Sequence, residues 1–502
     1  MKNVILDRFP VAGINEFTDQ LEDDIKVKVV ITLEEKPIPN EVTECYSSLS
    51  LSKGVGIEFC PWVMGRKEIE YFSKYEGLFL SMLSRCDVYK DSFTTEEMSE
   101  HYNRLINFWL HKLNHEKINI IFSMDVPHVP SSFALYLVAK YLKIMHLYMD
   151  CALVCNKFHF IGCSFKNRML LVENKTQTSN AFINAYDKFS FDYKNKSTES
   201  ISKYTYFFNE RKDNNWWRML VMDLASSVPF SLRVLLKGKV KFRGFYATEL
   251  AWKTSRRRWC DKKSGFNRLS LFFAKLSERL KIIQARKRYR KICSDSSQLD
   301  KFILFVPPSE PEAAVLPIAL SMRRSHTALR MLISKLPGDV NIVYKEHPIS
   351  FSQQLIFTSD WKSNFYYEDL AKLGRIKFVC ENASTRELIE NSIGVATLNG
   401  TVALEALLEE RHCITFAAQW YNELDGIHHV KTGNDIEAAI NIMLSKTCPR
   451  PDPTQVDFSK NFIALDGFNI ATYSGDDYKQ ICRAMWQAYK DFLILDDRKW
   501  DV

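Results

Sequence analysis

The stretch that decides the fold is GVATLNGTVALEALLEERHCITFAA, residues 394–418. A short apolar run ends in the polar turn Asn399-Gly400-Thr401, and the helix-like segment VALEALLEE follows at once. The chain then returns to a second apolar run, CITF, at 413–416. A strand, a turn, a helix and another strand in this order predict a βα unit of a parallel sheet.

The same alternation continues on the N-terminal side of this stretch. Runs rich in β-branched and aromatic residues predict strands at 302–306, 341–345 and 375–380, and mixed segments predict helices at 328–336 and 384–392. Such repetition is typical of an open, mostly parallel sheet covered by helices on both faces. Ligands of these sheets bind at the carboxyl ends of the strands, so the turns there carry the candidate site.

The first half of the chain shows this pattern less regularly. Strands are predicted from Lys26 to Leu33 and from Lys117 to Met124, and a helix from Thr94 to His115 opens on the capping signal TTEE. We therefore expect an α/β fold with two Rossmann-like domains facing a central cleft and a basic helical insert between them. The expected segments are an acceptor-side domain at 1–235, the insert at 236–297, a nucleotide-sugar domain at 298–450 and a helical tail at 451–502 that packs back on the core.

Length and composition narrow the class of protein. The chain has 502 residues, of which 46% are hydrophobic and 25% charged, which excludes fibrous and largely disordered proteins. No stretch approaches the roughly 20 apolar residues that cross a bilayer, and the first residues lack the apolar run of a signal peptide. The 12 cysteines form no CxxC pair, which favours free thiols in a reducing compartment. We expect a cytoplasmic protein.

Positive charge is concentrated in one segment. Residues 237–291 hold 19 Lys and Arg against three acids, so the rest of the chain is net acidic although the whole carries +8. Within the segment, apolar residues from Phe266 to Ile283 are spaced as one stripe of a helix. The helix is either a connector that packs this stripe on a domain or a basic amphipathic face on an anionic surface. The candidate contacts for a membrane or an acceptor are Arg256, Arg257, Arg258, Lys262 and Lys263.

The turn Lys345-Glu346-His347-Pro348 closes a predicted strand of the second half. Lys345 and His347 can both contact a phosphate through charge-assisted hydrogen bonds. The competing interpretation is a histidine that serves only packing or faces solvent. Nucleic acid could use the charge of the basic segment at 237–291, but no recognisable nucleic-acid-binding module surrounds that segment, so we expect no nucleic-acid partner.

The Asn399-Gly400-Thr401 turn offers a second set of ligand contacts. Gly400 permits close approach of the backbone, and Asn399 and Thr401 add donors where a helix begins. The competing interpretation is a simple helix cap. Glu405, one turn into the helix, either accepts a hydrogen bond from a ribose hydroxyl or faces solvent.

Carboxylates follow two other predicted strands. Asp125 comes directly after the 117–124 strand and is a candidate base or nucleophile, with a helix cap as the alternative. Glu312 lies in the proline-rich loop PPSEPEAAVLP, residues 307–317, which is either a lid wall or a hinge element.

Three segments together resemble the capsule polysaccharide biosynthesis family of bacterial glycosyltransferases, which includes 3-deoxy-manno-octulosonic acid (Kdo) transferases. They are PPSEPEAAVLP (307–317), LPGDVNIVYKEHP (336–348) and GVATLNGTVALEALLEERHCITFAAQWY (394–421). A less specific match is FSMDVPHVPSSFALYLVAKYLKI (122–144). The chain departs from the family at Pro307-Pro308-Ser309, where relatives often have Pro-Leu-Gln, so the identity of the donor is in question.

The resemblance implies a two-domain GT-B fold that binds a nucleotide sugar in the second domain and an acceptor against the first. It places His347 and Thr401 at phosphate-contacting positions, with Asn399 and Gly400 in the same turn, and matches Glu312 to the glutamate of the proline-rich loop. Asp125 is the positional candidate for the catalytic carboxylate. His347 and Lys345 would stabilise the charge that develops on the leaving phosphate, so no metal ion or other cofactor is required.

The function expected is transfer of a sugar to a bacterial surface polysaccharide, such as capsule or lipopolysaccharide, or to another lipid-linked acceptor. The favoured donor is a CMP-sugar that carries Kdo or a related acidic sugar. We expect the protein to work at the cytoplasmic side of the inner membrane, in peripheral contact with its anionic surface. The alternatives are a sugar-nucleotide 2-epimerase on the same fold and a non-catalytic protein that binds anionic surfaces.

Overall fold

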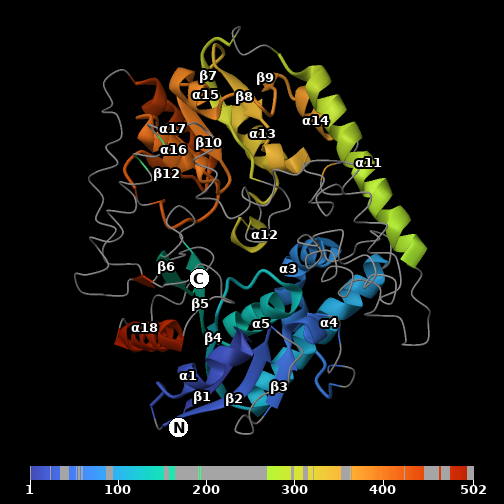
Figure 1. The fold of residues 1–502 in the computed structure, drawn as a ribbon, viewed down its shortest axis with the longest axis vertical. Coiled ribbons are helices and arrows are strands. Elements are labelled where there is room, and N and C mark those ends of the chain that lie inside the picture. The colour runs from blue at the N-terminus through green and yellow to red at the C-terminus, as the bar shows by residue number, and fades with distance from the viewer. Residues whose placement is uncertain are drawn as a thin grey trace, which may run out of the picture.

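The structure, a computed structural model, has two α/β domains, one above the other in Figure 1. The residues that it describes are 2–151, 158–163, 190, 193, 268–308, 315–445, 463–464 and 475–494, without 23, 34–43, 53, 55–56, 58–59, 86–93, 295–298, 320–321, 352–361, 363–364 and 423. The predicted fold class, α/β with two Rossmann-like domains, is confirmed.

The N-terminal sheet is mostly parallel. Its strand order is β13-β6-β5-β4-β1-β2-β3, with β6 and β13 antiparallel to their neighbours and the others parallel. The strands are β1 (Lys2–Phe9), β2 (Ile25–Thr32), β3 (Glu44–Ser47), β4 (Ile118–Ser123), β5 (Met145–Cys151), β6 (Phe158–Gly162) and β13 (Ile463–Ala464). β2 and β4 lie where the sequence predicts them.

β1 is a central strand that the sequence analysis did not predict. Val4, Ile5 and Leu6 are fully buried, and β1 pairs with β2 on one side and with β4 on the other. Lys2 begins the strand, and its two other charged residues, Asp7 and Arg8, stand at its carboxyl end. The strand is therefore apolar through the sheet and becomes charged at the edge where parallel sheets bind ligands.

Helices cover the N-terminal sheet. They are the 3-10 helix η1 (Val11–Gly13), α1 (Ile14–Thr18), α2 (Ser48–Ser52), α3 (Arg66–Arg85), α4 (Thr95–His115), α5 (Pro130–Tyr141) and α18 (Gly475–Ile494). α4 begins as predicted, because Thr94 and Glu97 form a reciprocal capping box. α18 packs beside α1, and a Cβ atom on Gly13 would lie 2.4 Å from the Tyr478 ring, so glycine leaves the room that α18 needs.

The C-terminal sheet is parallel throughout, in the order β12-β11-β10-β7-β8-β9. Its strands are β7 (Phe302–Phe305), β8 (Asn341–Lys345), β9 (Ile376–Val379), β10 (Gly394–Thr397), β11 (Cys413–Thr415) and β12 (Ile427–His429). Its helices are α12 (Val315–Ile318), α13 (Ser325–Lys335), the 3-10 helix η5 (Pro348–Phe351), α14 (Tyr366–Ala371), α15 (Thr385–Asn391), α16 (Val402–Leu408) and α17 (Gly433–Leu444). The predicted strand–turn–helix–strand unit at 394–418 is confirmed as β10, α16 and β11.

The long helix α11 (Arg268–Ile292) runs along the flank of the C-terminal domain (Figure 1). Tyr289 is fully buried, and its hydroxyl donates to the Val379 carbonyl at 2.6 Å. Arg286 and Arg290 both pair with the buried carboxylate of Glu381, at 2.7 and 2.6 Å. Among the described residues, neither α11 nor any other helix is long and apolar enough to span a membrane.

Two members of the predicted apolar stripe of this helix do not pack on the domain. Leu280 and Ile283 are 45% and 41% exposed, whereas Ile282 and Tyr289 are buried. The physical reason is that the Tyr289 hydrogen bond and the Glu381 ion pairs fix which side of α11 faces the sheet. The interpretation of the stripe as a connector's packing surface is therefore wrong for Leu280 and Ile283.

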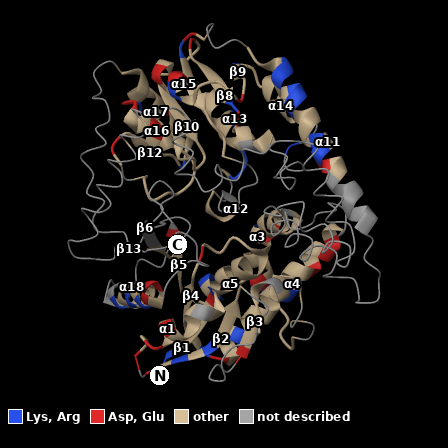
Figure 2. Ribbon diagram, viewed as in Figure 1, with Lys and Arg blue, Asp and Glu red and all other residues tan. Residues whose placement is uncertain are grey.

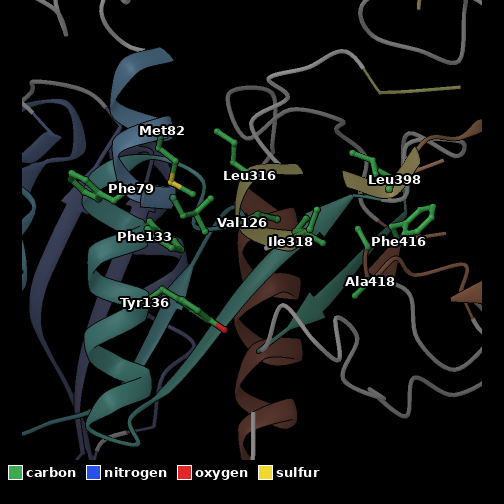
Figure 3. Packing of buried hydrophobic residues seen from close by; sticks show 14 of the residues in the cluster. Phe79, Met82, Val126, Phe133, Tyr136, Leu316, Ile318, Leu398, Phe416 and Ala418 are labelled. Atoms are coloured by element: carbon green, nitrogen blue, oxygen red, sulfur yellow. The ribbon is translucent and has the colours of Figure 1, made fainter. Parts of the chain in front are cut away.

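The two domains meet through one cluster of buried apolar residues (Figure 3). The labelled residues of this interdomain cluster are Phe79 and Met82 of α3, Phe133 and Tyr136 of α5, Val126 after β4, Leu316 and Ile318 of α12, and Leu398, Phe416 and Ala418 after β10 and β11. Val126 directly follows Asp125, and Leu398 directly precedes Asn399. The cluster therefore joins the carboxyl ends of the two sheets.

Ile318→Ala tests the interdomain cluster. Because Ile318 is 3% exposed, the truncation leaves a cavity, and we expect the free energy of unfolding to fall by about 2–4 kcal/mol. The measurement is the urea midpoint. The control is Ile69→Ala, at a 52% exposed position of α3, which should change stability by less than about 0.5 kcal/mol. An unchanged midpoint for Ile318→Ala would contradict packing of the domains through this cluster.

Candidate functional site

A fully buried carboxylate, that of Glu346, fixes the turn after β8. Five donors reach it: the hydroxyls of Tyr344, Ser350 and Tyr367 at 2.9 Å each, the His347 backbone N–H at 3.1 Å, and the Lys362 ammonium group. Burial acts to raise the pKa of Glu346, but the Lys362 charge and the hydroxyl donors hold it below its ordinary value. Glu346 is therefore an ionised, fully satisfied anchor.

The same anchor ties the turn to α11. The backbone N–H of Glu346 donates to the Tyr289 hydroxyl at 2.9 Å, and that hydroxyl donates in turn to Val379. Lys345 and His347 were predicted from the sequence as site residues, but Glu346 between them was not. The sequence does contain a signal for Glu346, because a carboxylate directly after a buried apolar strand is itself close to the core, and a buried carboxylate requires hydrogen-bond partners.

The Lys345 side chain differs from that of Glu346 because no described residue forms a hydrogen bond or ion pair with it. Lys345 is 4% exposed, and its backbone belongs to the β8–β9 ladder. Burial lowers the pKa of Lys345, opposed first by the charge of Glu405 on α16. Conversely, burial raises the pKa of Glu405 to about 7, opposed by Lys345. The two groups face each other electrostatically at the carboxyl edge of the sheet.

His347 lies beside this pair, half-buried, with a fixed backbone. Its N–H donates to Glu346, and its carbonyl accepts from the Ser350 N–H at 2.9 Å. The turn Asn399-Gly400-Thr401 leaves β10, two strands away across β7. Those predicted donor-side residues that the structure describes thus stand at one edge of one sheet, on and after β8, on the turn after β10 and on α16.

The Asn399-Gly400-Thr401 turn is held from within. A Cβ atom on Gly400 would lie 2.8 Å from Thr397 Oγ1, and the Gly400 carbonyl accepts from the Tyr421 hydroxyl at 2.9 Å. Glycine at this position is therefore explained by packing inside the turn. Thr401 occupies the N-cap position of α16 without a capping hydrogen bond from its side chain. Asn399 Oδ1 is buried and finds no donor among the described residues.

In the N-terminal domain, Asp125 follows β4 at the corresponding edge. Arg8 donates to its Oδ2 atom at 3.0 Å, and the Val126 N–H donates to Oδ1 at 2.8 Å. Asp125 keeps 29% of its side chain exposed, against 13% for Arg8. α5 begins only at Pro130, with Val129 at its N-cap, so Asp125 does not cap that helix. Its carboxylate is oriented yet accessible.

Arg8 has an unusual backbone. Its φ of 59° is in the left-handed region, and the register of β1 against β2 shifts there, between Asp7 and Phe9. Strain of this kind persists only where surrounding contacts impose it, and it is common at functional sites. The sequence analysis did not single out Arg8.

Buried polar groups hold β1 in this conformation. Asp7 is fully buried and accepts from Ser123 at 2.8 Å and from Ser132 at 3.1 Å. Ser123 Oγ also lies 2.6 Å from His146 Nε2. Burial raises the pKa of Asp7 to about 6, opposed by Arg8, and burial lowers the pKa of His146 to about 3. The buried network at the end of β1, next to Arg8, thus contains a neutral histidine and a carboxyl group with a pKa of about 6.

Several predicted residues fall outside the described part of the chain. They are Glu312 of the proline-rich loop and the five basic candidates, Arg256, Arg257, Arg258, Lys262 and Lys263. Within the described residues, no group of three or more His, Cys, Asp or Glu side chains is placed to hold a metal ion. The predicted independence from metal remains a prediction.

Comparison with known families gives a match over the donor-side edge. Residues 319–435 match the family described as capsule polysaccharide biosynthesis protein. This part of the chain is therefore similar to the capsule polysaccharide biosynthesis family. The family segment contains the Glu346 turn, the Asn399-Gly400-Thr401 turn and Glu405, so the predicted resemblance is confirmed over these residues. No curated protein matches the chain in sequence.

Solved structures resemble the chain only distantly. The UDP-GlcNAc 2-epimerase from Methanocaldococcus jannaschii is 13% identical, with 97% of this chain and 99% of that chain covered at a TM-score of 0.25. KpsC, a beta Kdo 2,7 transferase from Thermosulfurimonas dismutans, is 10% identical, with 96% and 99% covered at 0.27. The UDP-GlcNAc 2-epimerase from Neisseria meningitidis is 11% identical, with 99% and 100% covered at 0.22. TM-scores this low support no conclusion about activity or substrate.

Asp7→Asn tests the buried network behind Asp125. The pKa of Asp7, about 6 in the folded protein, lies above the ordinary aspartate pKa of 3.8. The wild type is therefore most stable when Asp7 is protonated, and it loses that stability as pH rises through 6. We expect the variant to gain about 2–3 kcal/mol relative to wild type between pH 4 and pH 8. The measurement is the urea midpoint of both proteins across this range. A constant difference between them would contradict the burial of a titrating carboxyl.

Proposed function

We propose that the protein is a glycosyltransferase of GT-B type that moves a sugar from a nucleotide donor to a bacterial surface polysaccharide or a lipid-linked acceptor. The observation that carries the proposal is Lys345, a residue only 4% exposed at the carboxyl edge of the sheet, within the segment that matches the family, and without an ion pair to a described residue. A buried charge is unfavourable unless an opposite charge reaches it. The phosphate of a nucleotide sugar supplies that charge.

The chemistry of the donor side follows from where charge develops. As the glycosidic bond breaks, negative charge gathers on the leaving phosphate, next to Lys345, His347 and the backbone N–H groups at Thr401. Burial raises the pKa of Glu405 to about 7, opposed by the charge of Lys345, so Glu405 can take up a proton when a phosphate binds. These groups stabilise the leaving phosphate without a metal ion or other cofactor.

The acceptor side uses Asp125. Its carboxylate either removes a proton from the acceptor hydroxyl or attacks the sugar first, and the second route would retain the configuration at the anomeric carbon. Arg8 fixes the direction of this carboxylate. The interdomain cluster joins the two edges, so a donor bound beside Asn399 and an acceptor beside Asp125 can meet. We favour a CMP-sugar of the Kdo type as donor and a glycan or glycolipid at the inner membrane as acceptor.

His347→Ala tests the donor site in a thermal-shift panel with CMP, UDP, GDP and ADP, each with and without magnesium. A nucleotide at 100 times its dissociation constant stabilises the folded state by about 2.7 kcal/mol. We expect a response to CMP that does not depend on magnesium and that His347→Ala removes. The control is His115→Ala, whose side chain is 66% exposed at the far end of α4, and it should keep the response.

Other outcomes of this panel correct the proposal in different ways. A response to UDP or GDP instead of CMP would keep the donor site and overturn the CMP-sugar. Full response by His347→Ala would contradict the assignment of His347. Turnover of UDP-GlcNAc without any acceptor would show a 2-epimerase, and silence across the panel from folded protein would favour a non-catalytic protein that binds anionic surfaces.

Asp125→Asn separates binding from chemistry. We expect the nucleotide response to be unchanged, since Asp125 lies in the other domain, and transfer to fall by roughly 10²-fold or more. The measurement is consumption of CMP-Kdo in the presence of a bacterial glycolipid extract. Asp339→Asn, at a site whose side chain is 65% exposed, is the matched control. Transfer by Asp125→Asn at the wild-type rate would remove Asp125 from the catalytic machinery.

A further inference from the structure

The basic residues at 286–291 of α11 divide into two classes by their partners. Those that face the C-terminal domain are paired: Arg286 and Arg290 with Glu381, and Arg288 with Glu368 at 3.9 Å. Lys287 and Lys291 are exposed and form no ion pair with any residue that the structure describes. Their charges are thus available to a partner outside the chain.

Large exposed apolar side chains gather on the same helix. Across the described residues, the exposed large hydrophobic side chains are Val63, Ile69, Leu280, Ile283 and Phe365. Two of these lie on α11, and the Phe365 ring stacks under the guanidinium group of Arg288 at 4.7 Å. Three of the five exposed hydrophobic residues therefore lie on or against one helix, which scattered surface residues do not explain.

The exposed lysines and the exposed aliphatic residues lie on one face. Leu280, Gln284, Lys287 and Lys291 follow one another at intervals of four, three and four residues, and Ile283 lies next to Gln284. Residues at these intervals line one side of an α-helix. We call this set the α11 outer face. Figure 2 shows Lys and Arg along the upper part of α11, at the rim of the C-terminal domain.

The face carries no negative charge. Glu278 is the one acidic residue of α11, and it is buried with an ion pair to Lys281 at 2.8 Å. Lysines next to exposed aliphatic side chains are suited to a lipid surface, where an anionic headgroup layer covers an apolar hydrocarbon layer. The lysine ammonium groups stay at the polar level, and the aliphatic side chains enter the hydrocarbon boundary.

We propose that the α11 outer face docks on an anionic lipid surface, with Leu280 and Ile283 inserted at the boundary and Lys287 and Lys291 at the headgroups. A second copy of this chain would place lysines against lysines, which disfavours pairing of two such faces. A nucleic-acid backbone would use the lysines and leave Leu280 and Ile283 in water. The inference deepens the proposed function, on which it rests for the membrane contact, and gives that contact a defined surface beside the donor site.

The test is flotation of the full chain with vesicles of phosphatidylethanolamine and phosphatidylglycerol, compared with vesicles of phosphatidylcholine alone. We expect wild type to bind the anionic vesicles selectively, and binding to weaken as salt rises. Leu280→Ser with Ile283→Ser should lower the partition coefficient at least about tenfold, because two apolar side chains leave the boundary. Lys287→Glu with Lys291→Glu should do the same and abolish the preference for anionic lipid.

The matched control is Val63→Ser with Ile69→Ser, which removes two exposed aliphatic residues from the N-terminal domain. It should change the partition coefficient by less than about twofold. Vesicle binding that survives the Leu280 and Ile283 changes, or that the control pair weakens equally, would overturn the proposal. Lysine-dependent binding of a single-stranded RNA oligomer without vesicle binding would overturn it in favour of nucleic acid.

The nucleotide panel keeps this test separate from the proposed function. The Leu280 and Ile283 variant should respond to nucleotide as wild type does, because these side chains point away from the sheet. If the protein binds vesicles but responds to no nucleotide, the proposal for the α11 outer face is supported and the proposed transferase function is contradicted. If it responds to a nucleotide but does not bind vesicles, the transferase proposal is supported and the proposal for the α11 outer face is contradicted.

Discussion

The carboxylate of Glu346 is the constraint on which the donor side of the molecule depends. It collects donors from β8, η5, α14 and Lys362, while its own backbone N–H is held by α11 through Tyr289. An ion buried so deeply is tolerated only when its acceptor capacity is filled. The backbone on both sides of it is thereby fixed, and that backbone presents Lys345 and His347. Such preorganisation is what a site for a developing phosphate charge requires.

The N-terminal domain also uses a buried, hydrogen-bonded carboxylate to fix the end of a strand, with different residues. Asp7 is buried among the hydroxyls of Ser123 and Ser132, and it holds the end of β1, where Arg8 takes its left-handed conformation. Arg8 then orients Asp125. In each domain, a buried carboxylate holds in place the charged side chains that we propose as ligand contacts. The interdomain cluster brings the two arrangements to a common boundary.

Strong local patterns made most of the architecture predictable. Apolar strands bounded by turns gave β2, β4 and β7 to β11, and the TTEE signal gave the start of α4. β1 was not predicted because its apolar run is short and ends in the charged residues Asp7 and Arg8. These two residues belong to the hydrogen-bond network around Asp125, which cannot be recognised from the strand pattern. The packing face of α11 was also missed, since ion pairs to Glu381, distant in sequence, override the spacing of apolar residues.

The residues of the candidate site also divide into those that the sequence predicts and those that it does not. Residues in turns after strands, such as Lys345, His347 and Asp125, are visible in the sequence because polar groups there break an apolar pattern. Their supports, Glu346, Asp7 and His146, are not, because each acquires its meaning from partners that only the fold assembles. Tyr289 shows this most clearly: it lies 57 residues from the backbone group that it holds.

The central claim is that a donor phosphate binds at the carboxyl edge of the C-terminal sheet. Hydrogen exchange of the backbone amides, with and without the nucleotide that stabilises the protein, tests it most directly. We predict that added protection concentrates at residues 345–350 and 397–405, the turns after β8 and β10. Nucleotide binding that protects only the N-terminal sheet, or only α11, would contradict the claim.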